Sequence, residues 1–159
     1  MIDDTDRIIL FLLQEDARIS NAEIARRVRM APSAVLERIR GLKREGVIME
    51  FTTRLDPQAV DCGLLAFVAI KTNEKRARWD VGKMISGIPE VLEVHDIAGE
   101  DCYLVKLRTR DTESLYQLLK EKFGGNEAIT STKTTIVLRT AKDTTKLPFK
   151  KSSRLKPGG

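Results

Sequence analysis

The chain has 159 residues, a hydrophobic fraction of 42% and a formal net charge of +5 at neutral pH. This length accommodates two small domains and excludes two large ones. The longest apolar run, residues 8–13, is far shorter than the roughly 20 residues of a membrane-spanning helix, and the aspartates before it exclude a secretory signal. We therefore expect no membrane association and a cytoplasmic location, where Cys62 and Cys102 stay reduced.

Two helices are predicted near the N-terminus. The first spans about residues 4–14, and its apolar side chains pack against the helices that follow. Ser20 and Glu23 have the spacing of a capping box, in which each side chain accepts a hydrogen bond from the other residue's backbone N–H. A second helix therefore begins at Asn21.

A third helix follows after a short turn. Pro32 suits the first helical position because its fixed φ is helical and its missing N–H is not needed there. Gly46 ends the helix at the C′ position. Between them, apolar residues recur at helical spacing and form an inward stripe: Val35, Leu36, Ile39 and Leu42. Two short helices joined by a turn are a common device for binding the major groove of double-stranded DNA.

The side of the third helix opposite this stripe is the candidate DNA-reading surface. At ~1.5 Å per residue the helix is roughly 21 Å long, enough to lie across a major groove about 12 Å wide. Residues 17–48 contain eight basic and three acidic side chains, a net +5 that suits the phosphate backbone. The predicted DNA-binding residues are Arg29, Ser33, Ala34, Glu37, Arg38, Arg40 and Arg44. A solvated helical hairpin shows the same pattern, so the helix pair alone leaves both interpretations open.

Residues 47–55 are predicted to be extended, as a wing and a connector, and turn-forming residues at 56–63 mark a hinge. Strands and helices then alternate in the order βαββαβ, at residues 64–71, 75–87, 91–98, 101–109, 111–123 and 129–140. This order closes into one antiparallel sheet with both helices on one face. The fold class is therefore α+β, with an N-terminal winged helix-turn-helix and a C-terminal ferredoxin-like domain. The predicted boundaries are 1–50 for the first domain, 51–63 for the linker, 64–149 for the second domain and 150–159 for a basic flexible tail.

The predicted sheet has a second face that its own helices leave uncovered. Apolar residues at 136–138, and the alternation of Val91, Glu93, His95 and Ile97, make part of that face apolar. We therefore expect a second copy of the chain to cover it, as a homodimer. His95 is interpreted as a hydrogen-bonded sheet residue, with a pH-sensitive role near an effector as the alternative.

The connection between the second and third strands, residues 98–103, is a polar loop whose residues fit a hairpin turn and also suit a small ligand. Gly99 permits φ > 0 and leaves backbone N–H groups accessible, and Glu100 or Asp101 can accept hydrogen bonds from the ammonium group of an amino acid. An ordinary polar hairpin turn has the same composition. The chain has a single histidine and no GxxxxGK, HExxH or GxSxG motif, which excludes the common catalytic constellations. We expect no metal and no cofactor.

Several separated motifs, in this order, resemble the Lrp/AsnC family of transcription regulators over about residues 2–149. They are MIDDTDRIILFLLQEDARIS, the helix pair, LKREGVIMEF, the GEDCYL run at 99–104 and TTIVLRTAKDTTKLPF. The resemblance implies a sequence-specific transcriptional regulator that responds to a small effector, an amino acid or a related metabolite. It also implies an effector site between neighbouring subunits that includes Gly99, Glu100, Asp101 and Tyr103, and face-to-face dimers that associate further into tetramers or octamers.

The sequence departs from this family at three positions. Cys102 stands where many relatives have aspartate, while Arg29 and Ala31 stand where relatives usually have a turn glycine and a capping serine. Two other functions fit the resemblance: a haem-pathway decarboxylase subunit, and an interaction protein that caps its relatives. A decarboxylase needs basic and histidine side chains around a tetrapyrrole, which the single histidine and the clustered arginines disfavour. The basic third helix disfavours the interaction protein.

Overall fold

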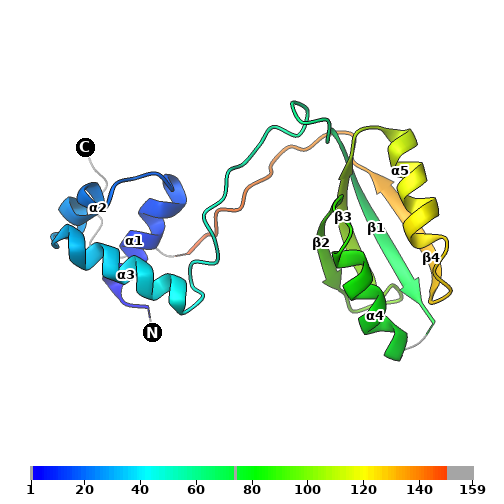
Figure 1. Ribbon diagram of the computed structural model, residues 1–159, viewed down its shortest axis with the longest axis horizontal. Coiled ribbons are helices and arrows are strands. Elements are labelled where there is room, and N and C mark those ends of the chain that lie inside the picture. Colours follow the sequence, from blue (N-terminus) through cyan, green and yellow to red (C-terminus); the bar gives the residue numbers. More distant parts are fainter. Residues whose placement is uncertain (1, 74, 150–159) are drawn as a thin grey trace. The chain divides into compact units, whose positions relative to one another are not determined.

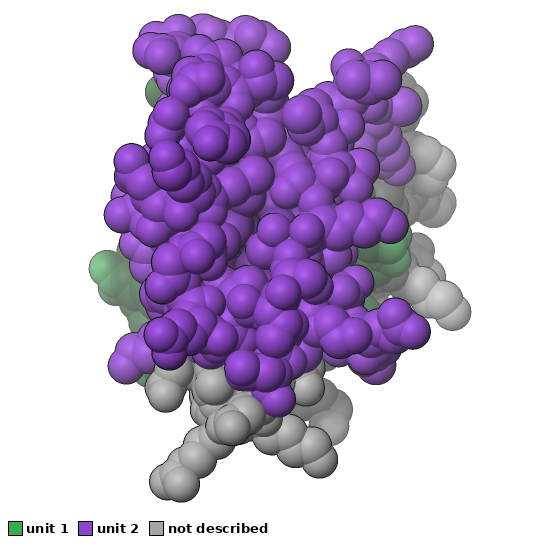
Figure 2. All heavy atoms as spheres, turned by 90° about the vertical axis from the view of Figure 1, so that its right-hand side faces the viewer, with its two compact units in different colours: residues 1–53, 143–159 green, residues 54–142 purple. Residues whose placement is uncertain are grey.

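The computed structural model describes residues 2–73 and 75–149. The chain forms two compact units, coloured separately in Figure 2. The sheet unit is continuous from Arg54 to Lys142, whereas the N-terminal unit combines the residues up to Thr53 with the segment from Asp143 onward. The N-terminal unit is therefore built from two separate stretches of sequence. The predicted tail, 150–159, lies outside the described residues.

Within the described residues, the N-terminal unit has the helices α1 (Asp4–Glu15), α2 (Asn21–Val28) and α3 (Pro32–Arg44), clustered together in Figure 1. All three begin where the sequence predicts. Each contributes an apolar stripe to a common core, formed by Ile8, Ile9, Leu12, Ile24, Ala25, Val35, Ile39 and Leu42. Leu36 is predicted in the same stripe but is only half-buried, because it lies on the helix to one side of the other core residues of α3.

The cap of α2 differs from the prediction in one respect. Ser20 Oγ accepts a hydrogen bond from the backbone N–H of Glu23 at 3.1 Å, but the Glu23 carboxylate pairs with Arg26 and Arg27. The predicted capping box is therefore only half formed, because the two arginines bind the Glu23 carboxylate, which in a full box accepts the backbone N–H of Ser20. Gly46, at φ +72°, ends α3 as predicted, with the hydrogen bonds of a Schellman motif.

Among the described residues, the segment after α3 that is predicted to be extended contains no regular strand before the sheet unit. The N–H groups of Val47 and Ile48 both bond to the carbonyl of Leu42, 2.9 and 3.1 Å away, and are therefore not available to a strand partner. Residues 49–56 are exposed and have no regular secondary structure. The connector is thus an irregular segment that begins at the helix cap.

The sheet unit has the predicted βαββαβ order. Its elements are β1 (Leu64–Thr72), α4 (Lys75–Ser86), β2 (Val91–Asp96), β3 (Tyr103–Thr109), α5 (Thr112–Leu118), the π-helical turn η1 (Leu119–Phe123) and β4 (Ile129–Ile136). The strands pair in the order β2-β3-β1-β4, antiparallel throughout, and α4 and α5 cover one face (Figure 1). The last strand is shorter than the predicted 129–140 because its partner β1 begins only at Leu64.

The covered face of the sheet and its two helices enclose the second core. The largest of its fully buried side chains are Phe123, Ile70, Ile85, Leu107, Val68 and Val105. A register shift in β2 after Val91 turns Val91 and Val94 toward this core, and Glu93 and His95 toward the open face. The prediction that Val91 shares a face with Glu93 is therefore wrong, because the irregularity interrupts the strand alternation.

Asp111 caps α5 and is held in its charged form. The hydroxyl and the backbone N–H of Ser114 donate to Asp111 Oδ1 at 2.7 and 2.8 Å, and Arg110 Nε donates to Oδ2 at 2.9 Å. These contacts, the hydroxyl first, hold the pKa of Asp111 well below its usual range. The predicted single helix over 111–123 is α5 followed by the π-helical turn, which places Phe123 in the core.

Lys146 and Leu147 form polar contacts with side chains of α1. The Gln14 side-chain amide donates to the carbonyl of Leu147 at 3.0 Å and accepts from its N–H at 2.9 Å, as a neighbouring strand would. Lys146 Nζ also pairs with Glu15 Oε2 at 2.9 Å, with both side chains about half exposed. In the structure the segment 143–149 is therefore part of the N-terminal compact unit.

Candidate DNA-binding surface and effector loop

α3 presents a continuous polar stripe to solvent, opposite the residues that it contributes to the core. The exposed members, spaced about one helical turn apart, are Ser33, Glu37, Arg40 and Arg44. Arg40 Nη1 pairs with Glu37 Oε1 at 2.7 Å, but the two side chains are 62% and 67% exposed. Such an exposed pair contributes little stability, so both groups are free to exchange their partner for DNA.

The chemistry of this stripe suits the edges of base pairs. An arginine can bind guanine O6 and N7 through two donors, and a glutamate can accept from cytosine N4. The methyl group of Ala34, half-buried beside the stripe, suits a thymine methyl. The structure thus brings five of the predicted DNA-binding residues onto one surface: Ser33, Ala34, Glu37, Arg40 and Arg44.

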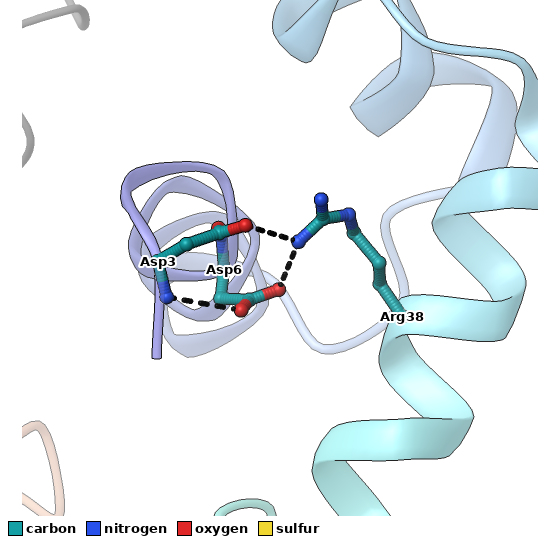
Figure 3. A network of polar contacts seen from close by, with 3 residues as sticks. All are labelled: Asp3, Asp6 and Arg38. Carbon is teal, nitrogen blue, oxygen red and sulfur yellow. Dashed lines mark hydrogen bonds and ion pairs between the residues drawn. The ribbon is translucent and has the colours of Figure 1, made fainter. Parts of the chain in front are cut away.

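Arg38 is engaged differently from these residues. Its Nη1 donates to Asp3 Oδ2 at 2.7 Å and to Asp6 Oδ1 at 2.8 Å, as Figure 3 shows. The Arg38 side chain is 33% exposed, about half the value for Arg40. Because both carboxylates come from the N-terminal end of α1, these contacts join α1 to the middle of α3.

Asp3 and Asp6 also form a complete capping box at the start of α1. The N–H of Asp6 donates to Asp3 Oδ1 at 2.7 Å, and the N–H of Asp3 donates to Asp6 Oδ2 at 3.1 Å. The amide of Asp6, and after it Arg38, lower the pKa of Asp3, while Asp3 first and Asp6 second raise the pKa of Arg38. The sequence does not identify either aspartate as a partner of Arg38, because side chains more than 30 residues apart leave no local signal.

The turn between α2 and α3 is conformationally strained. Arg29 is exposed and adopts the left-handed conformation, φ +57° and ψ +50°, which costs about 1–2 kcal/mol for a residue with a Cβ. Ala31 is the N-cap of α3 and makes no side-chain hydrogen bond to the first turn. Glycine and serine suit these two positions better, so the turn is less stable locally than one with those residues.

The loop between β2 and β3 carries the predicted effector residues. Gly99 is exposed at φ +146°, and since a Cβ added there would meet nothing within 4 Å, the backbone conformation alone requires glycine. Glu100 is exposed and Asp101 is half-buried. Tyr103 differs from these three, because its side chain is 3% exposed and packs in the core against Gly82 of α4. The loop therefore offers two carboxylates beside a permissive backbone.

Cys102 is held toward the neighbouring strand. Its N–H donates to the carbonyl of Ile70 at 2.8 Å, and Thr72 Oγ1 donates to its Sγ at 3.2 Å. The thiol packs against the core of the sheet unit. The groups at the loop surface that can accept hydrogen bonds from an ammonium group are therefore the carboxylates of Glu100 and Asp101.

The open face of the sheet is partly apolar and partly charged. Phe67 and Leu104 lie half-buried on it. Beside them, Lys106 Nζ pairs with Glu93 Oε1 at 2.9 Å, and His95 Nε2 lies 3.1 Å from Glu93 Oε2. Lys106 and then His95 lower the pKa of Glu93. His95 is thus a hydrogen-bonded sheet residue, as predicted.

No helix within the described residues is long and apolar enough to cross a membrane. The same part of the chain contains no cluster of three or more His, Cys, Asp or Glu side chains that could hold a metal ion.

A helix pair with an exposed basic stripe, together with a βαββαβ unit that carries a polar surface loop, defines the class of DNA-binding proteins with a separate sensing domain. Sequence comparison agrees: residues 2–49 match the winged helix-turn-helix DNA-binding family, and residues 65–147 match the Lrp/AsnC ligand binding domain. The chain belongs to the Lrp/AsnC family of transcriptional regulators.

Relatives of known identity match almost the whole chain. The HTH-type transcriptional regulator FL11 of Pyrococcus furiosus is 35% identical over 150 residues, 94% of this chain and 98% of its own. The leucine-responsive regulatory protein of Escherichia coli K12 is 36% identical over 153 residues, 94% of this chain and 92% of its own. The structure of the transcriptional regulator NMB0573 of Neisseria meningitidis, a complex with L-methionine, matches with a TM-score of 0.86 and 31% identity, covering 93% of this chain and 97% of that one.

These relatives are transcriptional regulators and not enzymes, and they cover both units of the chain. The protein is a DNA-binding transcriptional regulator of the Lrp/AsnC type. The decarboxylase alternative is therefore not supported.

Proposed function

We propose that α3 lies in the major groove of the operator and that its exposed stripe contacts the bases and the backbone. The observation that carries this proposal is the stripe itself, since Ser33, Glu37, Arg40 and Arg44 are all exposed on the side opposite the core. Arg29, exposed in the turn before α3, adds a cation for a neighbouring phosphate. Base contacts from the stripe would then set sequence specificity, and the surrounding cations would set affinity.

We further propose that an amino acid binds at the Gly99-Glu100-Asp101 loop and changes DNA affinity or assembly. The carboxylates suit its ammonium group, and the backbone N–H groups around Gly99 suit its carboxylate. The Neisseria relative is a complex with L-methionine, and the Escherichia relative is named for its response to leucine. Apolar amino acids of this size are therefore the first candidates. Tyr103, buried beneath the loop, would support the site rather than line it.

We propose a homodimer as the smallest functional species, with tetramers or octamers as further assemblies. The sheet has one face that α4 and α5 leave open, and Phe67 and Leu104 lie on it. A second copy would bury this apolar surface and present two α3 helices to successive half-sites.

The DNA proposal is tested by fluorescence anisotropy with a duplex that the wild-type protein selects from a randomised pool. If Arg40 contacts a base, Arg40→Ala should weaken binding by about 1–3 kcal/mol and relax specificity at that base position. If Arg40 contacts a phosphate, the same change should reduce the salt slope by about one unit. Arg110→Ala is the matched control, because Arg110 is a 68% exposed arginine of the sheet unit. Unchanged affinity and slope in both Arg40→Ala and Arg44→Ala would remove α3 from the DNA-binding surface.

A further inference from the structure

The contacts of Arg38 with α1 use only one of its three nitrogens. A guanidinium group has five N–H donors, two of them on Nη1. Both carboxylates, from Asp3 and from Asp6, bind this one nitrogen, as Figure 3 shows. Nε and Nη2 form no hydrogen bond with the described residues. The remaining edge of the group therefore keeps three donors for another partner.

This arrangement is unusual for an arginine whose only task is to join two helices. A carboxylate that binds arginine for stability commonly takes two parallel hydrogen bonds from the fork of the group. Here the two carboxylates share Nη1 and leave the Nε and Nη2 edge unoccupied. That edge has the geometry that binds a phosphate, or guanine O6 and N7, through two donors.

The two carboxylates are themselves held in place. Each accepts the backbone N–H of the other residue in the capping box, so neither can turn without unpairing the first turn of α1. Asp6 is 13% exposed at its side chain, which limits its movement further. The position of Nη1 is therefore fixed by a rigid element and not by a flexible surface partner.

We propose that Asp3 and Asp6 are positioning residues that hold Arg38 so that its Nε and Nη2 edge meets the operator. This inference rests on the proposed role of α3 in DNA binding. A free arginine must lose the motion of its long side chain on binding, whereas a held arginine has lost that freedom in advance. Asp3 and Asp6 thus raise DNA affinity without touching DNA.

The opposite interpretation is competition, in which the carboxylates occupy Arg38 and DNA must displace them. The two interpretations predict opposite changes in DNA affinity when a carboxylate is removed. Removing one carboxylate should weaken DNA binding if it positions Arg38, and should strengthen binding if it competes, since a negative charge also leaves the neighbourhood of the phosphates. The unoccupied edge of the group favours positioning.

The test uses Asp3→Asn in the full chain, because asparagine caps a helix as well as aspartate does and one amide oxygen can still accept the N–H of Asp6. Asp4→Asn is the matched control: Asp4 is exposed, lies in the same turn and is not a partner of Arg38. Both changes remove one negative charge from the same turn of α1. Asp6→Asn is the second variant, and thermal unfolding establishes that each variant is folded.

Binding to the duplex selected by the wild-type protein is measured by fluorescence anisotropy over a range of salt concentrations. Asp3→Asn should raise Kd up to about 12-fold with an unchanged salt slope, because Arg38 is then held in advance by Asp6 alone but still reaches the DNA. Arg38→Ala should raise Kd and reduce the slope by about one unit if the edge meets a phosphate. Asp4→Asn should leave Kd unchanged or lower it.

The decisive comparison is Asp3→Asn in the Arg38→Ala background, where it should no longer weaken binding. The inference is overturned if Asp3→Asn tightens binding or leaves it unchanged, or if it weakens binding equally without Arg38. A wild-type protein that selects no duplex from the pool would instead refute the proposed function of α3. The two failures are thereby distinguished.

Discussion

Ala31→Ser should stabilise the N-terminal unit by about 1 kcal/mol. Ala31 already has the backbone conformation of a capping residue, φ −71° and ψ 143°, close to the −73° and 150° of Ser20. In α2 that conformation brings Ser20 Oγ to 3.1 Å from the N of Glu23. A serine at position 31 should therefore accept a hydrogen bond from the equivalent amide, that of Ala34.

The magnitude follows from what α3 lacks. Its first intrahelical bond, from the N–H of Val35 to the carbonyl of Ala31, is present at 3.2 Å. Pro32 has no N–H, so the amides of Ser33 and Ala34 are the first-turn donors that the helix itself leaves unpaired. A serine cap that satisfies one of them contributes about 0.5–2 kcal/mol, typically ~1. For a unit of this size, ~1 kcal/mol corresponds to a rise in Tm of about 4–8 °C.

The assay combines urea unfolding of the full chain with amide hydrogen exchange. Ala31→Ser should raise the urea midpoint and slow exchange at Ala34 by about fivefold, which is the factor for ~1 kcal/mol. Ser20→Ala is the reverse control and should lower the midpoint by a similar amount. If Ser20→Ala destabilises the unit while Ala31→Ser changes neither the midpoint nor exchange at Ala34, the reasoning from cap geometry is refuted.

Four further predictions follow from the structure. Arg29→Gly should raise the free energy of unfolding by about 0.5–1 kcal/mol. The change relieves a left-handed conformation that costs ~1–2 kcal/mol, but glycine loses more conformational entropy on folding, which costs ~0.5–1 kcal/mol. If Arg29 binds a phosphate, the same change should also reduce the salt slope of DNA binding by about one unit. Calorimetric titration with L-methionine and L-leucine should show binding to the wild type and little to Gly99→Val or Asp101→Ala; equal binding by all three would place the site elsewhere. Light scattering at micromolar concentration should show a dimer, and Phe67→Glu should give a monomer, whereas a folded wild-type monomer would contradict the sheet-pairing proposal. Folding lowers the pKa of Asp111, whereas an aspartate in the unfolded chain has a pKa of about 4. The contacts of Asp111 therefore stabilise the fold fully above about pH 4, and this stabilisation is lost as the pH falls through the pKa of the folded state. Asp111→Asn should consequently lose less stability on acidification than the wild type, as measured by circular dichroism.

Features with a local cause could be predicted from the sequence. The starts of the three helices, the end of α3 at Gly46 and the order of the sheet elements each depend on residues a few positions apart. Capping spacing, helical periodicity and a positive-φ glycine act within one turn of the chain. The positive φ of Gly99 belongs to the same group, because it follows from the place of this glycine in a tight strand connection.

The features that sequence reasoning missed have non-local causes. The half-formed box at Ser20 results from two arginines that take the Glu23 carboxylate. The register shift in β2 becomes visible only when its pairing with β3 is known, because alternation by itself assigns every second residue to one face. The partners of Arg38 lie on another helix, so the exposed and the held arginines of α3 look alike in the sequence.

The contact between Gln14 and Leu147 sets an order of events during synthesis. The two residues are separated by 133 positions, and a ribosome adding ~5–20 residues per second needs roughly 7–27 s to cover that distance. The helices α2 and α3 are synthesised early in this interval, but until it ends the side-chain amide of Gln14 has no backbone partner from the end of the chain. The sheet unit, Arg54 to Lys142, is made entirely within the same interval. The DNA-binding unit of each new molecule is therefore completed only after its own sensor has been synthesised.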